Sequence, residues 1–280
     1  MLSDDIKRVV NESLTEDLGG VLDPLRDITA ALIPADEISE ATVITREPGI
    51  FCGEECVPAV FKTLCPDVEC VMHVHDGDRV QPNELLFTVK GPSRALLTGE
   101  RTCLNIIQTL SGVATHVNAY VKAMEGTSCR LLDTRKTIPG LRTLLKYAVT
   151  AGGGHNHRMG LFDAYLIKEN HIMACGGITA AVKKANELTP GVKVEVEVEN
   201  NDELQEAIAA GADIVMLDNY KLPDMYKAVE INNHRVKLEI SGNVDLKTIG
   251  EYAKTGVDFI SVGALTKNVC AMDLSMRFKK

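Results

Sequence analysis

The residues of this sequence best suited to chemistry lie in one cationic segment, from Arg130 to His171. The segment holds seven Lys and Arg residues against three acids, whereas the whole chain of 280 residues has 30 Lys and Arg against 39 Asp and Glu, a formal charge of -9. The acidic balance of the chain argues against nucleic-acid binding, which usually requires a basic face. The local excess of cations predicts a small, highly anionic ligand instead. The cations are Arg130, Arg135, Lys136, Arg142, Lys146, Arg158 and Lys168.

Two glycine-containing motifs lie in this segment: DTRKTIPG at residues 133–140 and GGGHNHRMG at residues 152–160. Glycines allow the backbone to approach a phosphate or carboxylate closely, and an Arg fork such as that of Arg158 can bind a carboxylate through two parallel hydrogen bonds. A solvated basic turn at Arg135 and Lys136, and a flexible loop at the three glycines, are the alternatives. The residue types alone fit both interpretations.

The cationic segment belongs to a repeated pattern of strand, loop and helix that begins after Thr127. Such repeated units indicate parallel strands with crossover helices, and six of them in about 140 residues favour a barrel-like closure over an open doubly wound sheet. A dinucleotide-binding sheet is also disfavoured because GGGHNHRMG does not fit G-x-G-x-x-G. The candidate strands are residues 129–133, 163–168, 193–199, 213–218, 236–241 and 258–263.

The ends of these strands carry polar residues or glycine. In parallel α/β barrels the active site lies at the carboxyl ends of the strands, so we expect one site assembled from several of them. The glycine-containing ends of the last two strands fit a phosphate site made of backbone N–H groups and a helix N-terminus. In chain order the ends are Asp133–Lys136, Lys168–His171, Glu197 with Glu199, Asp218–Asn219, Ser241–Asn243 and Gly263–Ala264.

The strand KVEVEVEN at residues 193–200 alternates valine with glutamate. Because side chains alternate between the two faces of a strand, Glu195, Glu197 and Glu199 share one face. A central barrel strand could not keep inward carboxylates unpaired, since burying an isolated charge is costly. They would need Lys or Arg partners or a metal. An edge strand with a solvated face is the alternative.

The first part of the chain predicts a mixed α and β region. A helix is expected from about Ser3, strands within residues 40–53 and 68–92, and a long helix from about residue 96 to 124. The eight cysteines contain no C-x-x-C pair, which favours free thiols over a zinc site. The N-terminal helix lacks an apolar signal-peptide region, and no run approaches the roughly 18 apolar residues of a membrane span. We therefore expect a cytoplasmic protein with reduced thiols and no membrane attachment.

Several motifs together resemble the quinolinate phosphoribosyltransferase family, also called nicotinate-nucleotide pyrophosphorylase (carboxylating). The pairing of DTRKT-x-PG with GGGxNHRxGL is the most specific part, and the resemblance extends from about Glu16 to Lys267 with the motifs in family order and spacing. The further motifs are GERTCLN at 99–105, VEVEVEN at 194–200, IVMLDN at 214–219, EISGNV at 239–244 and SVGALT at 261–266.

The resemblance implies a fold and a reaction. The fold is an N-terminal α/β sandwich domain at residues 1–112, joined by the C-terminal residues 268–280, and an open TIM-like α/β barrel at residues 113–267. The reaction converts quinolinate and phosphoribosyl pyrophosphate (PRPP) into nicotinate mononucleotide, pyrophosphate and CO₂. It belongs to NAD biosynthesis and depends on Mg²⁺. The family also implies a homodimer.

The resemblance also implies roles for individual residues. Quinolinate would be bound by Arg135, Lys136, His157, Arg158 and Lys168, with Arg101 reaching in from the partner subunit. Glu197 and Asp218 would serve the ribose hydroxyls and Mg²⁺, and Lys136, Glu197 and Asp218 would be catalytic. The 5′-phosphate would lie on Ser241, Gly242, Asn243 and Gly263, and Thr134, Val262 and Ala264 complete the implied substrate-binding set.

Other functions stay open at this point. The alternatives are a molybdenum-transport-associated relative and a phosphoribosyltransferase for another pyridine such as nicotinate. The complete set of Arg135, Lys136, His157, Arg158 and Lys168 favours a substrate with two carboxylates. A non-catalytic anion sensor is disfavoured, because it would gain nothing from the carboxylates of Glu197 and Asp218. A lyase that forms a Schiff base at Lys168 is the remaining alternative.

Overall fold

The computed structural model describes residues 2–279 and divides into two compact units. The first unit comprises Met1–Asn118, Thr137–Gly153 and Leu265–Lys280, and the second comprises Ala119–Lys136 and Gly154–Ala264. The chain therefore passes between the units four times, after residues 118, 136, 153 and 264. Within residues 2–279, no helix combines the length and the apolar character needed to cross a membrane.

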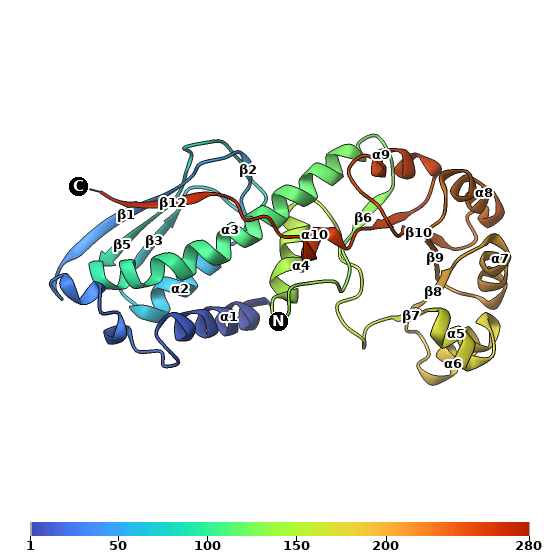
Figure 1. Ribbon diagram of the computed structural model, residues 1–280, viewed down its shortest axis with the longest axis horizontal. Helices are drawn as coiled ribbons and strands as arrows, with labels where there is room; N and C mark the ends of the chain where they lie inside the picture. The colour runs from blue at the N-terminus through green and yellow to red at the C-terminus, as the bar shows by residue number, and fades with distance from the viewer. Residues whose placement is uncertain (1, 280) are drawn as a thin grey trace. The chain divides into compact units, whose positions relative to one another are not determined.

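The first unit is built on an antiparallel sheet of order β12-β1-β5-β3, with the two-stranded β2-β4 beside it. The C-terminal strand β12 pairs with β1 from Ala41↔Phe278 to Thr45↔Leu274, so the end of the chain belongs to this unit. Helices lie against one face of the sheet (Figure 1). The elements are α1 (Leu2–Asp17), the 3₁₀ helices η1 (Pro24–Arg26) and η2 (Ala30–Leu32), β1 (Ile38–Thr45), β2 (Gly49–Ile50), α2 (Cys56–Leu64), β3 (Glu69–Met72), β4 (Arg79–Val80), β5 (Leu85–Pro92), most of α3 (Ser93–Ala123), α4 (Arg142–Ala151) and β12 (Leu274–Phe278).

Helix α4 illustrates why residues 137–153 join the first unit. Its apolar residues Leu144, Leu145, Ala148 and Val149 are spaced three and four apart and are buried, which is the pattern of a helix with one buried face. The guanidinium of Arg8 on α1 donates to the carbonyl of Gly140, just before α4, at 2.6 Å. The segment between the two sequence motifs is thus packed within the first unit, although both motifs begin or end in the second.

The second unit is a parallel sheet of six strands with helices along its outer side (Figure 1). Strand order is β6-β11-β10-β9-β8-β7. Among the described residues β6 and β7 are edges that do not pair with each other, so the barrel is open, and the predicted fold class is confirmed. Its elements are β6 (Arg130–Leu132), β7 (Tyr165–Ile167), α5 (Glu169–Cys175), α6 (Ile178–Leu188), β8 (Val194–Val198), α7 (Asn201–Ala210), β9 (Ile214–Asp218), α8 (Leu222–Asn232), β10 (Lys237–Ser241), α9 (Ile249–Tyr252), η3 (Ala253–Thr255) and β11 (Phe259–Ser261), followed by α10 (Ala264–Lys267) at the boundary of the units.

Strand β8 shows how the sequence pattern fixes the two faces of this sheet. Val194, Val196 and Val198 are fully buried, and Glu195 and Glu197 alternate with them. Because β8 lies between β7 and β9, it is an interior strand rather than an edge. The edge-strand alternative is therefore wrong, and the glutamate face is enclosed. Glu199 lies beyond the strand end and is exposed.

Candidate active site

A cavity of about 670 Å³ lies at the carboxyl ends of the parallel strands in the second unit. It brings together most of the predicted site residues, which come from the ends of β6 to β10 and from the loop at residues 154–160. Predicted residues that line it are Thr134, Arg135, Lys136, His157, Arg158, Lys168, Glu197, Asp218, Ser241, Gly242 and Asn243. Asn219, one of the polar strand-end residues, also lines it, and Leu166, Met216 and Ser261, which were not predicted, complete the wall.

Four predicted residues do not line this cavity. Val262 is buried and donates its backbone N–H to Leu132 at 3.0 Å. Gly263 lies against the basic turn, since a Cβ there would be 2.9 Å from Cδ of Lys136, and Ala264 begins α10. Arg101 is an exposed residue of α3 and belongs to the first unit.

Buried Asp133 anchors the loop that carries the second motif. Its backbone N–H donates to His155 at 3.1 Å, and the N–H of His155 donates to Leu131 at 2.8 Å, so the loop runs alongside β6. The carboxylate of Asp133 accepts the N–H of His157 at 2.9 Å. Asp133 is therefore an organising residue that sequence reasoning left without a role. Its position directly after an apolar strand could have indicated this role.

The first two glycines of GGGHNHRMG serve packing and chain direction. A Cβ at Gly152 would lie 2.5 Å from the carbonyl oxygen of Ala114. Gly153 has φ +92°, a conformation that favours glycine. Neither residue lines the cavity. The expectation that these glycines bring backbone close to an anion does not describe their place in the structure.

Two guanidinium groups, those of Arg135 and Arg158, line the cavity. Burial, together with the charge of Arg135, lowers the pKa of Arg158 below its ordinary value. Nη1 of Arg158 donates to the carbonyl of Ala164 at 3.1 Å, which fixes one arm of the fork. Two like charges that influence each other in this way favour the binding of an anion that compensates them.

The carboxylates of Glu197 and Asp218, called here the acidic side, line the same cavity. The carboxylate of Glu197 pairs with the ammonium of Lys168, from the neighbouring strand end. Asp218 accepts a hydrogen bond from Nδ2 of Asn219 at 2.7 Å, and Oδ1 of Asn219 accepts from Nδ2 of Asn243 at 3.1 Å. Asn219 thus links the acidic side to the glycine-containing loop after β10. Oxygen donors from one or two carboxylates are the ligands that Mg²⁺ accepts beside substrate phosphates and water, so Glu197 and Asp218 fit that ion.

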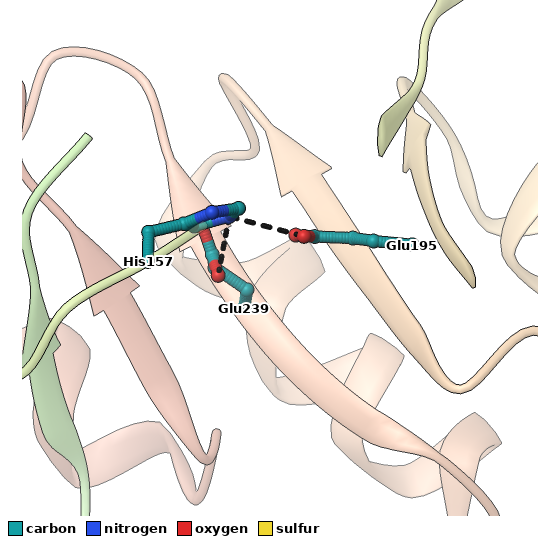
Figure 2. A group of neighbouring side chains, drawn as sticks. All are labelled: His157, Glu195 and Glu239. Atoms are coloured by element: carbon teal, nitrogen blue, oxygen red, sulfur yellow. Dashed lines mark ion pairs between the residues drawn. The ribbon is translucent and has the colours of Figure 1, made fainter. Parts of the chain in front are cut away.

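A third group of side chains lies at the inner end of the site (Figure 2). Nε2 of His157 lies 3.0 Å from Oε2 of Glu195 on β8 and 3.6 Å from Oε2 of Glu239 on β10. Burial and the neighbouring charge of Glu195 raise the pKa of Glu239 from its ordinary value of 4.5 to about 8. Sequence reasoning missed Glu239. Its place in the sequence could have indicated a role in the site, because Glu239 lies two residues before Ser241 and therefore on the same face of an otherwise apolar strand.

The chain is similar to known proteins over nearly its full length. Residues 27–111 match the family model "Quinolinate phosphoribosyl transferase, N-terminal domain", and residues 113–277 match that of the C-terminal domain. A probable nicotinate-nucleotide pyrophosphorylase [carboxylating] of Bacillus subtilis is 41% identical, with 97% of this chain and 92% of that protein covered. The corresponding enzyme of Mycobacterium leprae is 38% identical, with 98% and 95% covered. The solved nicotinate-nucleotide pyrophosphorylase of Francisella tularensis superposes with a TM-score of 0.94 at 51% identity, covering 99% of this chain and 96% of that one.

Proposed function

The chain belongs to the quinolinate phosphoribosyltransferase family, and from this membership we propose that it makes nicotinate mononucleotide, pyrophosphate and CO₂ from quinolinate and PRPP. The reaction is a pentosyl transfer coupled to a decarboxylation and supplies NAD biosynthesis. The observation that supports it most is that one cavity is lined both by the cations Arg135, Lys136, Arg158 and Lys168 and by the carboxylates of Glu197 and Asp218, two sets that we call its cationic side and its acidic side. Quinolinate is a dianion and PRPP carries several more negative charges, so both substrates need the cations.

The cationic side is suited to quinolinate. Arg135 and Arg158 present two planar forks, and a fork can fix the plane of a carboxylate in a way that a Lys point charge cannot. Lys136, Lys168 and His157 complete the wall around them. The proposed role of the clamp is to orient the pyridine ring so that its nitrogen faces the ribose carbon.

The acidic side is suited to the ribose. Loss of pyrophosphate leaves positive charge on the ribose carbon, which the carboxylates of Glu197 and Asp218 can stabilise. When bound, Mg²⁺ would neutralise the charge of the leaving pyrophosphate. The residues Ser241, Gly242 and Asn243 would hold the 5′-phosphate. Once the ring nitrogen carries the ribose it is cationic, and CO₂ can leave from the adjacent carbon because the ring stabilises the resulting carbanion. That carbon then takes up a proton from solvent to give nicotinate mononucleotide.

We further propose a cytoplasmic homodimer in which Arg101 completes the site of the partner subunit. Arg101 is exposed on α3 and free to meet another chain. Leu161 and Phe162, in the loop before β7, are 74% and 80% exposed, and a covering partner would bury such apolar side chains. All eight cysteines are free thiols, which suits a reducing compartment.

Subunit mixing tests the shared site. Arg101→Ala and Lys136→Ala homodimers are each expected to be nearly inactive, whereas a mixture allowed to exchange subunits regains activity, because one of the two sites in each mixed dimer is then intact. A mixture as inactive as its parents, with exchange verified by mass spectrometry, would show that each subunit builds its site alone.

An endpoint assay tests the reaction itself. The enzyme is given PRPP and Mg²⁺ with either quinolinate or nicotinate, and CO₂ and nicotinate mononucleotide are measured. We expect both products from quinolinate and little mononucleotide from nicotinate. Product from nicotinate alone would mean that the cationic side binds a substrate with one carboxylate. No product from either substrate would refute the proposed function.

A further inference from the structure

Behind the cationic side of the cavity, two buried acids from separate strands converge on one histidine. Glu195 is 3% exposed and Glu239 is fully buried, and the His157 side chain that they face is 11% exposed. Figure 2 shows the three side chains approaching from different segments of the second unit, with the imidazole directed between the two carboxylates. No role in the proposed reaction has been given to either glutamate.

The hydrogen bonds of His157 define its tautomer. Nδ1 accepts the backbone N–H of Arg158 at 2.7 Å, so Nδ1 carries no proton. The proton of a neutral imidazole must then lie on Nε2, which points to Oε2 of Glu195 at 3.0 Å. Both ring nitrogens are therefore engaged by the protein. His157 lines the cavity, and its contacts with the Arg158 backbone and with Glu195 fix the orientation of its ring.

Burial of Glu195 and Glu239 lowers the stability of the fold. Within residues 2–279, Ser261 and Glu195 approach the carboxyl of Glu239 and influence its pKa, but no hydrogen bond of good geometry reaches either oxygen of Glu239, Oε1 of Glu195 or the hydroxyl of Ser261. Buried polar atoms left without partners destabilise a fold, so each needs an explanation. An apolar residue at position 239 would remove this cost, and the other interior residues of β10, Leu238 and Ile240, are apolar and buried.

We propose that Glu239, together with Glu195, is a positioning residue that holds the His157 imidazole in one orientation and one tautomer, so that Arg158 meets the substrate carboxylate in a preformed place. The link to Arg158 is direct, because the imidazole accepts that residue's backbone N–H. Asp133 fixes the same turn through the N–H of His157. The cluster therefore acts on quinolinate and leaves the PRPP side of the cavity alone.

Glu239→Leu in the full-length enzyme tests this proposal, which rests on the proposed function. Because the pKa of Glu239 is raised to about 8, its carboxyl is mostly neutral at pH 7 and a glutamine amide would resemble it. Leucine keeps most of the side-chain volume and removes both oxygens. We expect the KM for quinolinate to rise roughly tenfold, as is typical when the partner of a site ligand is lost, with less than about a twofold change in the KM for PRPP. Glu230→Gln, which removes an exposed acid of α8 in the same unit, is the matched control and should change neither constant.

The split between the two KM values separates positioning from a merely structural role. A structural role would lower the active fraction, and with it kcat, without favouring one substrate. An unchanged KM for quinolinate, or equal rises in both constants, would overturn the proposal.

The tautomer gives a second test that needs no variant. Nitrogen-15 spectra of the imidazoles in the wild-type enzyme should show His157 as a neutral ring protonated on Nε2. A ring protonated on Nδ1 or on both nitrogens would overturn the proposal even if Glu239→Leu failed to fold. So would stoichiometric zinc or manganese bound through the three side chains, which together form a possible metal-binding set. Lack of quinolinate turnover by the wild type would instead refute the proposed function.

Discussion

Gly242 offers the sharpest test of the loop that we assign to the 5′-phosphate. The residue has φ +91°, and a Cβ at this position would lie 2.2 Å from Oδ1 of Asn219 and 3.0 Å from its backbone nitrogen. Oδ1 of Asn219 accepts a hydrogen bond from Nδ2 of Asn243, and Nδ2 of Asn219 donates one to Asp218. Gly242→Ala therefore disturbs the residue that links the acidic side of the cavity to the loop.

The size of the effect follows from these contacts. A non-glycine residue in the left-handed region costs about 1–2 kcal/mol, and each hydrogen bond lost by a displaced Asn219 costs about 1 kcal/mol. The two hydrogen bonds of Asn219 together account for about 2 kcal/mol, which corresponds to roughly a 30-fold loss of kcat/KM for PRPP. We expect the backbone strain to appear in the midpoint of thermal unfolding instead.

Gly211→Ala is the matched control for this prediction. Gly211 ends α7 with φ +86°, and a Cβ there would meet no atom within 4 Å among residues 2–279. The control shares the backbone strain and lacks the collision, so it should lower the unfolding midpoint with kcat/KM for PRPP unchanged. If the two variants had the same kinetics, the collision with Asn219 would have no functional meaning and the reasoning would be refuted.

Three further predictions concern the clamp, the metal and the buried acid. Arg158→Lys should lose most activity while its circular dichroism and unfolding midpoint stay near wild type, because a Lys cannot make the bidentate contact; full turnover would exclude a planar clamp. Removing Mg²⁺ with EDTA should abolish turnover and added Mg²⁺ should restore it, whereas activity that is indifferent to EDTA would leave Glu197 and Asp218 without an ion to hold. Because the folded protein raises the pKa of Glu239 from 4.5 to about 8, the native state binds the extra proton, and this contribution to stability is present below about pH 4.5 and lost as the pH rises toward 8. Denaturant unfolding should therefore show Glu239→Gln gaining stability relative to wild type over that range, and parallel pH profiles would contradict the assigned shift.

Much of the second unit could be predicted from the sequence, because its strands are short apolar runs separated by helices and turn residues. Those signals are local, and each depends on a few neighbouring residues. Because active sites of parallel barrels lie at the carboxyl ends of the strands, the sequence also predicts that residues such as Lys168 and Asp218 share one cavity. The shared face of Glu195 and Glu197 could also be predicted, since period two is a property of the strand itself, but only the sheet order showed that β8 is an interior strand.

The remaining features depend on contacts between segments far apart in the sequence. The pairing of Glu195 with Glu239 joins residues on two strands that are not neighbours in the sheet, and no local pattern reveals it. The packing role of Gly152 likewise depends on the carbonyl of Ala114. The placement of residues 137–153 in the first unit was hidden for the same reason, because the amphipathic pattern of α4 does not show which core its buried face joins.

The measurement that tests the account most directly is a crystal structure of the enzyme with quinolinate bound. We predict that the ligand lies in the cavity at the carboxyl ends of the strands, with its two carboxylates against the forks of Arg135 and Arg158 and its ring nitrogen directed toward Glu197 and Asp218. Quinolinate bound elsewhere, or bound in this cavity with its carboxylates turned away from both arginines, would contradict the assignment of the cationic segment.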